Sequence, residues 1–322
     1  MGKKLIIDTD GGIDDAIALL ASFSEPELEI LGITTVYSNT SVENATRNAL
    51  DLMLMKKRDD IPVAKGADRP LSGVEKKSSS DVHGENGLGN IVIPHSSRKE
   101  LDIGASNFIV NKVNEYPGEV TILTLGPMTN IAKALEIDPT IAKKTKRLVV
   151  MGGAVFTHGN VTACSEANIH ADSTAAKIVF SSGFDLYLIG LDVTTKAEFS
   201  KAKLDALSSF QDDASKPIYD FVKSMLRFYF DFYFRVEGTF LSSPVHDPLA
   251  LMAVLDDSLF AFRRLPVSVI VSDDITNGMT IADMRCHPTE QNYVNVAIDV
   301  DANRAVWKIL SYFVSPQYLK EV

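Results

Sequence analysis

Hydrophobic positions follow two spacings along this chain, and the order of the two predicts its fold class. Short apolar runs are typical of buried strands, and here they occupy residues 5–7, 29–35, 61–64, 120–125, 147–151 and 185–193. Segments with helical spacing of apolar residues lie among them, at residues 14–23, 42–55, 128–135 and 172–180. Because strands that alternate with helices pair in parallel, we predict an α/β fold with an open, mostly parallel twisted sheet and helices on both faces.

The last third of the chain has a different pattern. Residues 196–240 are helical in spacing and rich in aromatic side chains, most of which we expect to pack in the core. Three apolar runs near residues 265–271, 279–284 and 293–300 predict antiparallel or edge strands, and residues 302–313 predict a final helix. Neither a linker nor a repeat interrupts the sequence, so we predict one domain over residues 1–322.

Four carboxylates converge where the first strand gives way to the first helix. Asp8 and Asp10 lie two residues apart at the end of the strand, Gly11-Gly12 predicts a turn, and Asp14 and Asp15 open the helix. Two like charges about 4 Å apart repel by about 4 kcal/mol at an effective dielectric constant of 20, more than the helix dipole offsets. Either some of these carboxylates take up protons or a hard cation such as Ca²⁺ or Mg²⁺ lies among them.

Other interpretations of this acidic segment fit less well. An EF-hand counted from Asp8 would need Glu at its twelfth position, which is Leu19, and the dinucleotide fingerprint G-x-G-x-x-G is absent. A metal-dependent phosphohydrolase with Asp8 as nucleophile is an alternative, but no Lys or Arg between Lys4 and Arg47 offers a phosphate contact.

Composition narrows the classes of partner. The chain has 322 residues, 45% hydrophobic content and a net charge of −10, which argues against nucleic acid as a partner because phosphate neutralisation needs a basic face. Two cysteines do not define a disulfide framework. The N-terminus does not resemble a signal peptide, and no apolar run reaches the about 18 residues of a membrane span. We therefore expect a cytoplasmic protein without membrane attachment that acts on small molecules.

Later polar clusters also follow predicted strands, at the edge where open α/β sheets bind ligands. A long irregular stretch, residues 66–96, places His83 between acidic and glycine residues, which is typical of a functional lid. The loop at residues 155–167 carries Asn160 and Glu166, and Asn168 follows it. Much further on, His246 and Asp247 open another helix.

Taken together, these motifs resemble the inosine-uridine-preferring nucleoside hydrolase family over nearly the whole chain. The strongest marker is the segment at residues 8–16, DTDGGIDDA. The others are TTV at 34–36 followed by Asn39, VHGE at 82–85, GPMTNIA at 126–132, MGG at 151–153, Asn160 with EAN at 166–168, and HDP at 246–248. Each marker alone is weak, but their joint order and spacing are specific.

The resemblance implies the α/β nucleoside hydrolase fold and a Ca²⁺-dependent N-ribohydrolase with one ion per chain. It implies Asp10, Asp15, Asp247 and the carbonyl oxygen of Leu125 as metal ligands, supported by Asp8. Asp10 would also take a proton from the water bound to the metal. Ribose-contacting residues would be Asp14, Asn39, Asn160, Glu166 and Asn168, with Met151 lining the sugar pocket and His83 and His246 facing the base.

The chemistry agrees with these residue types. Cleavage of a ribosyl C–N bond builds positive charge on the sugar, which carboxylates and amide oxygens stabilise. The departing base needs a proton, and His246 is the candidate acid because histidine titrates near neutrality. The glycine-containing lid with His83, together with His246, resembles the family members that act on pyrimidine nucleosides and inosine more than the strictly purine-specific ones, and Tyr229 and Tyr233 are candidate base contacts. A non-catalytic nucleoside- or calcium-binding protein on the same fold is a further alternative.

Two residues depart from the family pattern. Gly11 stands where the family usually has Pro, and we expect little effect because glycine tolerates unusual dihedral angles. Ala167 stands where the family usually has Phe, so we expect an altered pocket and leave base preference open. Family members form homodimers and homotetramers, and we expect one of these states.

Overall fold

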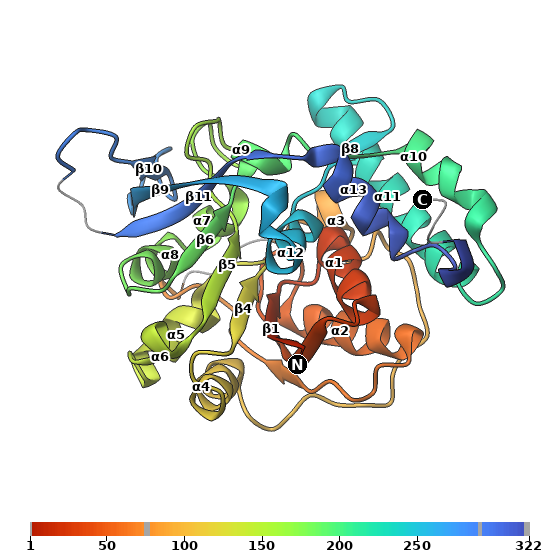
Figure 1. Cartoon of the computed structure of the whole chain (residues 1–322), viewed down its shortest axis with the longest axis horizontal. Coiled ribbons are helices and arrows are strands. Elements are labelled where there is room, and N and C mark those ends of the chain that lie inside the picture. Colours follow the sequence, from red (N-terminus) through yellow and green to blue (C-terminus); the bar gives the residue numbers. More distant parts are fainter. Residues whose placement is uncertain (1, 74–77, 289–291, 319–322) are drawn as a thin grey trace.

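A single mixed sheet forms the centre of the molecule. The computed structural model describes residues 2–73, 78–288 and 292–318. In this part of the chain the main sheet has nine strands in the order β10-β9-β11-β6-β5-β4-β1-β2-β3 (Figure 1). The pairs from β11 to β3 are parallel, whereas β9 pairs antiparallel with both β10 and β11. The predicted α/β class and the antiparallel strands near the C-terminus are confirmed.

Most strands lie where the apolar runs predicted them. The main sheet comprises β1 (Lys3–Thr9), β2 (Leu28–Thr35), β3 (Val63–Lys65), β4 (Thr121–Thr124), β5 (Arg147–Met151), β6 (Leu186–Ile189), β9 (Phe260–Val269), β10 (Thr280–Ala282) and β11 (Tyr293–Val300). A separate pair comprises β7 (Glu198–Ser200) and β8 (Ser242–Pro244). Successive residues of β1 pack into opposite cores, Leu5 and Ile7 on one face and Ile6 on the other, because side chains alternate along a strand.

Helices cover both faces of the sheet, as predicted (Figure 1). One layer contains α4 (Ala105–Glu115), α5 (Thr129–Ile137), α6 (Ile141–Lys144), α7 (Ala167–Ala171) and α8 (Ser173–Phe180). The other contains α1 (Ile13–Ser24), α2 (Val42–Lys56), α11 (Lys216–Glu237), α12 (Asp247–Leu255) and α13 (Ala302–Ser311). The short helices α3 (Ser80–His83), α9 (Leu191–Thr194) and α10 (Lys201–Ala206) lie in connecting segments.

Three segments differ from the sequence-based expectation. Helix α4 was not predicted, although Phe108, Ile109 and Val113 give it a buried face. The strand expected at residues 185–193 ends at Ile189, because Gly190 starts the turn of α9. The region 196–240 is not one helical segment, since β7 and α10 precede the 22-residue helix α11.

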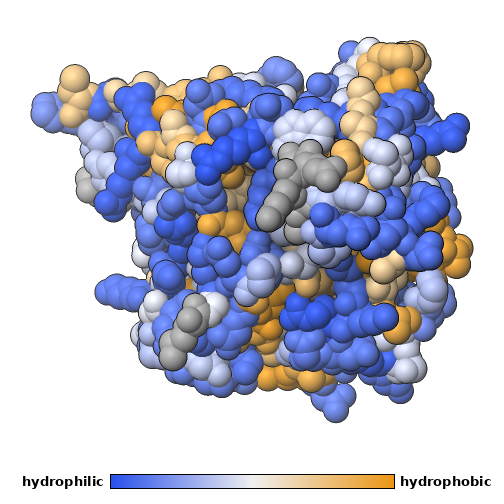
Figure 2. Space-filling view, turned by 45° about the vertical axis from the view of Figure 1, so that its right-hand side comes forward, coloured by the Kyte–Doolittle hydropathy of each residue, from blue (hydrophilic) through white to orange (hydrophobic). Residues whose placement is uncertain are grey.

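One face of the molecule is largely hydrophilic (Figure 2). Figure 2 shows charged and polar side chains over most of one face, with smaller hydrophobic areas between them. Within the described residues, no helix combines the length and apolar character needed to cross a bilayer. Because β1, β2, β4, β5 and β6 run in parallel, their carboxyl ends lie at one edge of the sheet, where the predicted polar residues follow them.

Candidate active site

A cavity of about 390 Å³ opens at the carboxyl ends of the parallel strands. Most of the predicted site residues line it: Asp14, Asn39, His83, Leu125, Met151, Asn160, Glu166, Asn168, Tyr229, Tyr233, His246 and Asp247. The other three, Asp8, Asp10 and Asp15, are fully buried and do not line the cavity. The structure therefore brings together residues from both ends of the chain.

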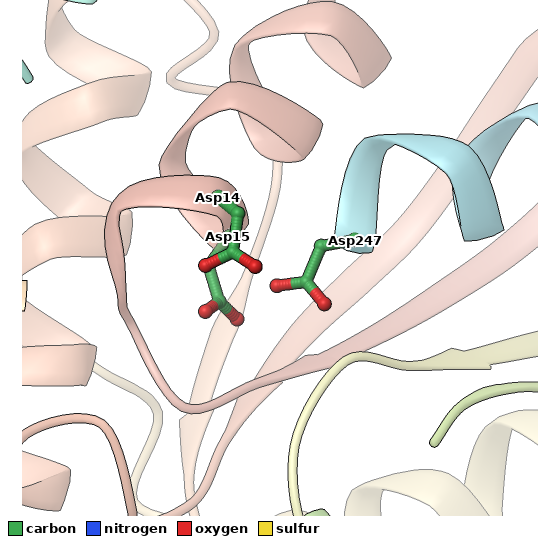
Figure 3. Close-up of side chains that lie close together, drawn as sticks. All are labelled: Asp14, Asp15 and Asp247. Carbon is green, nitrogen blue, oxygen red and sulfur yellow. The ribbon is translucent and has the colours of Figure 1, made fainter. Parts of the chain in front are cut away.

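The deepest part of the cavity is acidic. Two helix N-termini meet here, since Asp14 and Asp15 lie in the first turn of α1 and Asp247 begins α12. Each of these three aspartates offers a carboxylate oxygen, and the three oxygens lie within 4.8 Å of one another (Figure 3). All three side chains are buried. The resemblance to the family implied Asp10, Asp15 and Asp247 as metal ligands, whereas the three oxygens that lie this close together belong to Asp14, Asp15 and Asp247.

Asp15 is held rigidly by donors from the turn before α1. Its Oδ1 accepts hydrogen bonds from the Thr9 hydroxyl at 2.5 Å and from the Asp10 N–H at 3.2 Å. Its Oδ2 accepts from the Gly12 N–H at 2.9 Å and from Asn39 Nδ2 at 3.1 Å. These bonds aim the carboxylate without neutralising its charge.

Asn39 also fixes Asp10. Its backbone N–H donates to Asp10 Oδ2 at 3.1 Å, and its Nδ2 donates to Asp10 Oδ1 at 2.9 Å. Burial raises the pKa of Asp10 well above its ordinary value, and the neighbouring charges of Asp15 and Asp14 raise it further. A group with a raised pKa that is held next to other carboxylates is suited to accept a proton near neutrality.

Asp8 lies behind this group. Its Oδ1 accepts hydrogen bonds from the Thr34 hydroxyl at 2.5 Å and from Asn130 Nδ2 at 2.8 Å, and burial raises its pKa to about 7. Because Asp8 is fully buried and does not line the cavity, it is badly placed to attack a substrate covalently. No described Lys or Arg lines the cavity either, so nothing in the structure favours the phosphohydrolase alternative.

The acidic group is suited to a hard cation. Asp14 Oδ1 and Asp247 Oδ2 are buried and make no hydrogen bond. Burial, together with the charge of Asp15, raises the pKa of Asp14 to about 8, and burial and neighbouring carboxylates raise that of Asp247 well above its ordinary value. Buried polar atoms ordinarily have partners, and an all-oxygen donor set is what Ca²⁺ and Mg²⁺ bind. The residues present therefore fit a divalent cation.

One side of the cavity, which we call the polar wall, consists of Asn160, Glu166 and Asn168. Glu166 caps α7: its Oε1 accepts the Asn168 N–H at 2.8 Å, and its Oε2 accepts the N–H groups of residues 153 and 169, each at 3.0 Å. Burial raises the pKa of Glu166. Asn160 Oδ1 accepts the N–H of Ala167 at 3.0 Å.

Asn168 connects the polar wall to the ends of two strands. Its Nδ2 donates to the carbonyl oxygen of Leu125 at 2.7 Å and to that of Met151 at 3.2 Å. The Leu125 carbonyl, a predicted metal ligand, therefore lies beside a predicted ribose contact. The Asn168 amide therefore helps to fix the position of that carbonyl.

Another part of the cavity lining, which we call the aromatic wall, consists of His83, Tyr229, Tyr233 and His246. The Tyr229 ring lies 5.6 Å from that of His83 and 5.0 Å, edge to face, from that of Tyr233. The Tyr233 hydroxyl lies 3.0 Å from His246 Nε2, and Thr194 Oγ1 lies 2.9 Å from His246 Nδ1. Sequence reasoning missed Thr194, because only the fold brings α9 to the start of α12.

The two histidines are not charged in this environment. Burial lowers the pKa of each to about 4, so both rings are neutral at pH 7. His83 Nδ1 accepts the N–H of Ile13 at 3.1 Å, which places the single ring proton of His83 on Nε2. Burial therefore lowers the pKa of His246 below the near-neutral range expected from the sequence, and its two ring nitrogens lie within hydrogen-bond distance of the Tyr233 and Thr194 hydroxyls.

Comparison with known proteins identifies the class. The sequence model for the inosine-uridine preferring nucleoside hydrolases matches residues 5–307. Uridine nucleosidase 1 of Arabidopsis thaliana is 44% identical over 281 residues, which cover 87% of this chain and 82% of that protein. The chain therefore belongs to the inosine-uridine preferring nucleoside hydrolase family, as the motifs implied.

Solved structures agree with this assignment. The plant nucleoside hydrolase PpNRh1 superposes with a TM-score of 0.92 at 35% identity, covering 98% of this chain and all of the other (100%). A purine-preferring ribonucleoside hydrolase from Gardnerella vaginalis gives a TM-score of 0.90 at 34% identity, covering 97% of this chain and 98% of the other. The protein is thus an enzyme of the nucleoside hydrolase class, which cleaves the N-glycosidic bond of ribonucleosides.

Proposed function

We propose that the enzyme is a Ca²⁺-dependent N-ribohydrolase that converts pyrimidine nucleosides, inosine or both to the free base and ribose. The observation that carries this proposal is the meeting of three elements in one cavity: the buried carboxylates, the polar wall and the aromatic wall. A nucleoside has matching parts, namely a sugar rich in hydroxyls and a planar base.

The proposed ion is held by Asp10, Asp15, Asp247 and the Leu125 carbonyl, with Asp8 supporting them from behind and Asp14 beside them. When bound, such an ion lowers the pKa of a coordinated water and orients the ribose diol. The unpaired Asp247 Oδ2 and the all-oxygen donor set support this assignment. Calcium is preferred over magnesium because its looser coordination accepts carboxylates and a backbone carbonyl together.

The remaining roles, namely general base, ribose binding and base binding, are assigned to individual side chains. Asp10 is the proposed base, because its pKa is raised and Asn39 orients both of its oxygens. The ribose contacts and the stabilisation of positive charge on the sugar are assigned to Asp14, Asn39, Asn160, Glu166 and Asn168, with Met151 beneath. The aromatic wall faces the base, where Tyr229 and Tyr233 offer ring surfaces.

Protonation of the leaving base is assigned to His246 together with Tyr233. The two groups are in hydrogen-bond contact, so they act as one donor. The pair gives one proton to the departing base and afterwards takes up one proton from solvent, which restores its starting state. His83 presents Nε2–H as a donor because the Ile13 amide occupies its other nitrogen. A neutral donor of this kind suits a carbonyl oxygen on the base, which uridine and inosine both carry.

The relatives support this substrate range. One relative is named for uridine, and one structural neighbour is described as purine-preferring. Ala167, at the cavity rim, leaves room for bases of either size. The cytoplasmic location and the homodimeric or homotetrameric state expected from the sequence stay predictions, and light scattering after size-exclusion chromatography tests the second.

A nucleoside panel tests the proposal. Release of reducing sugar from uridine, cytidine and inosine is measured as kcat/KM, first as purified, then with a chelator, then after Ca²⁺ or Mg²⁺ is restored. We expect hydrolysis of at least one of these substrates, its loss with chelator and its recovery with Ca²⁺. The absence of ribose from every nucleoside would refute the activity, and full activity in chelator would refute the metal requirement.

A further inference from the structure

The loop at residues 153–166, which carries Asn160 and Glu166, is held by side chains from other parts of the chain. The N–H groups of residues 153–156 all donate to side-chain oxygens. In order along the chain, the acceptors are Glu166 Oε2 at 3.0 Å, Thr280 Oγ1 at 2.9 Å, Asp192 Oδ2 at 3.0 Å and Asp192 Oδ1 at 2.6 Å. Four consecutive amides satisfied in this way fix the path of the loop as it leaves β5.

Both carboxylate oxygens of Asp192 accept hydrogen bonds from this loop. Asp192 belongs to α9, is only 7% exposed, and accepts its hydrogen bonds from Val155 and Phe156. No described Lys or Arg forms an ion pair with it, so these two amides are the donors that offset its burial. Gly190 permits the approach, because a Cβ there would lie 2.9 Å from Asp192 Oδ2.

The other half of the loop is tied to the segment that joins β9 and β10. The carbonyl oxygen of Ile275 accepts from the Thr162 hydroxyl at 2.9 Å and from Cys164 Sγ at 3.1 Å. Ser165 forms an isolated antiparallel bridge with Met279, next to Thr280. Thr280 is only 1% exposed. We call Asp192 and Thr280, which hold loop 153–166 from two different segments of the chain, the clamp.

We propose that Asp192 and Thr280 are positioning residues for ribose recognition, which hold loop 153–166 so that Asn160 and Glu166 face the sugar hydroxyls. The inference rests on the proposed function, because it presumes that the polar wall binds ribose. Neither residue lines the cavity, so neither touches the substrate. They act through the loop, so their loss should change the recognition of the sugar hydroxyls more than the recognition of the base.

Thr280 offers the cleanest test. Thr280→Val removes the acceptor for the Ala154 amide with little change of shape, and Thr280→Ser keeps it. Thr145→Val is the matched control, since Thr145 is buried and its hydroxyl has no hydrogen-bond partner. Asp192→Asn tests the other residue of the clamp independently, so the experiment gives a result even if only one of the two variants folds.

Each variant is assayed on uridine and on its 2′-, 3′- and 5′-deoxy analogues. A buried amide left without an acceptor costs enough to lower kcat/KM for uridine about tenfold, mainly through KM. We expect Thr280→Val and Asp192→Asn also to reduce the preference for uridine over at least one deoxy analogue severalfold. Thr280→Ser and Thr145→Val are expected to keep the wild-type preference.

Two results would overturn the inference. One is wild-type discrimination among the four substrates in whichever of Thr280→Val and Asp192→Asn folds, or in both if both fold. The other is an equal loss on all four substrates, which would show that the clamp supports only the fold. An inactive wild-type enzyme on every nucleoside would instead refute the proposed function, so the two failures are distinguishable.

Discussion

Replacing one carboxylate of the acidic group should stabilise the protein when no cation is available. In the presence of a chelator at pH 8, we expect Asp14→Asn to unfold at a higher temperature than the wild type. Burial and the charge of Asp15 raise the pKa of Asp14 from 3.8 to about 8 in the folded protein. The folded state must therefore hold a proton that the unfolded chain releases, and this favours unfolding as the pH rises.

The size of the effect follows from the pKa. Between pKa values of 3.8 and about 8, the free-energy difference is about 5 kcal/mol at pH 8 and about 2 kcal/mol at pH 5. Stability from this group is complete below pH 4, falls as the pH rises and is lost above about pH 8. With an unfolding entropy of about 2.1 cal/mol/K per residue over 322 residues, Asp14→Asn should raise Tm by about 7 °C at pH 8 and by about 3 °C at pH 5.

Thermal unfolding followed by circular dichroism measures this effect, from pH 5 to pH 8, with chelator and with Ca²⁺. With Ca²⁺ the wild type should unfold at the higher temperature of the two, because it binds the ion more tightly and is stabilised more by it. Asp51→Asn is the matched control: Asp51 is also buried, but its carboxylate accepts the Ser96 N–H at 2.7 Å and lies 3.7 Å from Arg47. This control should lose stability in every buffer.

The refuting result is specific. If Asp14→Asn in chelator unfolds at or below the wild-type temperature at pH 8, the carboxylates of the cation-free site do not oppose folding. The same conclusion holds if the difference between the two proteins is no larger at pH 8 than at pH 5. In either case the acidic group would be a solvated cluster and not a site that requires a cation.

Three further substitutions test the cavity walls. Gly12→Ala should lower kcat/KM at least tenfold, because its Cβ would lie 2.8 Å from His83 Nδ1; unchanged kinetics would contradict the placement of His83. Tyr233→Phe removes the hydroxyl beside His246. In steady-state assays it should lower kcat about 100-fold with KM little changed, and an unaltered kcat would exclude a part for Tyr233 in proton transfer. Ala167→Phe narrows the cavity, so the ratio of kcat/KM for inosine to that for uridine should fall severalfold, and a rise would contradict this view.

The sequence predicted local features well because their signals are local. The apolar run before Asp8 and the helical spacing after Asp14 predict β1 and α1 directly, and the acidic turn between them predicts a charged site. Helix α4 was not predicted, although it has a buried apolar face; its N-cap is Gly104, which offers no capping side chain, so the start of the helix carries no sequence signal.

The pattern of apolar and polar residues along the chain could not predict contacts between distant segments. Nothing near Asp247 indicates that it meets the first turn of α1; the resemblance to the family supplied that pairing. Thr194 and Asp192 carry no signal of their own, since their partners lie 52 and 36–37 residues away. Likewise, no sequence pattern indicates that burial keeps His246 neutral, because that depends on the packing of Tyr233 and Thr194 around the ring.

The meeting of α1 with α12 has a consequence for how the chain folds. Asp15 and Asp247 are separated by most of the polypeptide, so closing the loop between them is entropically slow and the ion-binding site is completed only when the two ends of the chain dock. A cation held by these aspartates would stabilise only chains in which the start of α1 has met the start of α12. A nascent or truncated chain that stops before α12 would lack Asp247 and would bind the cation more weakly.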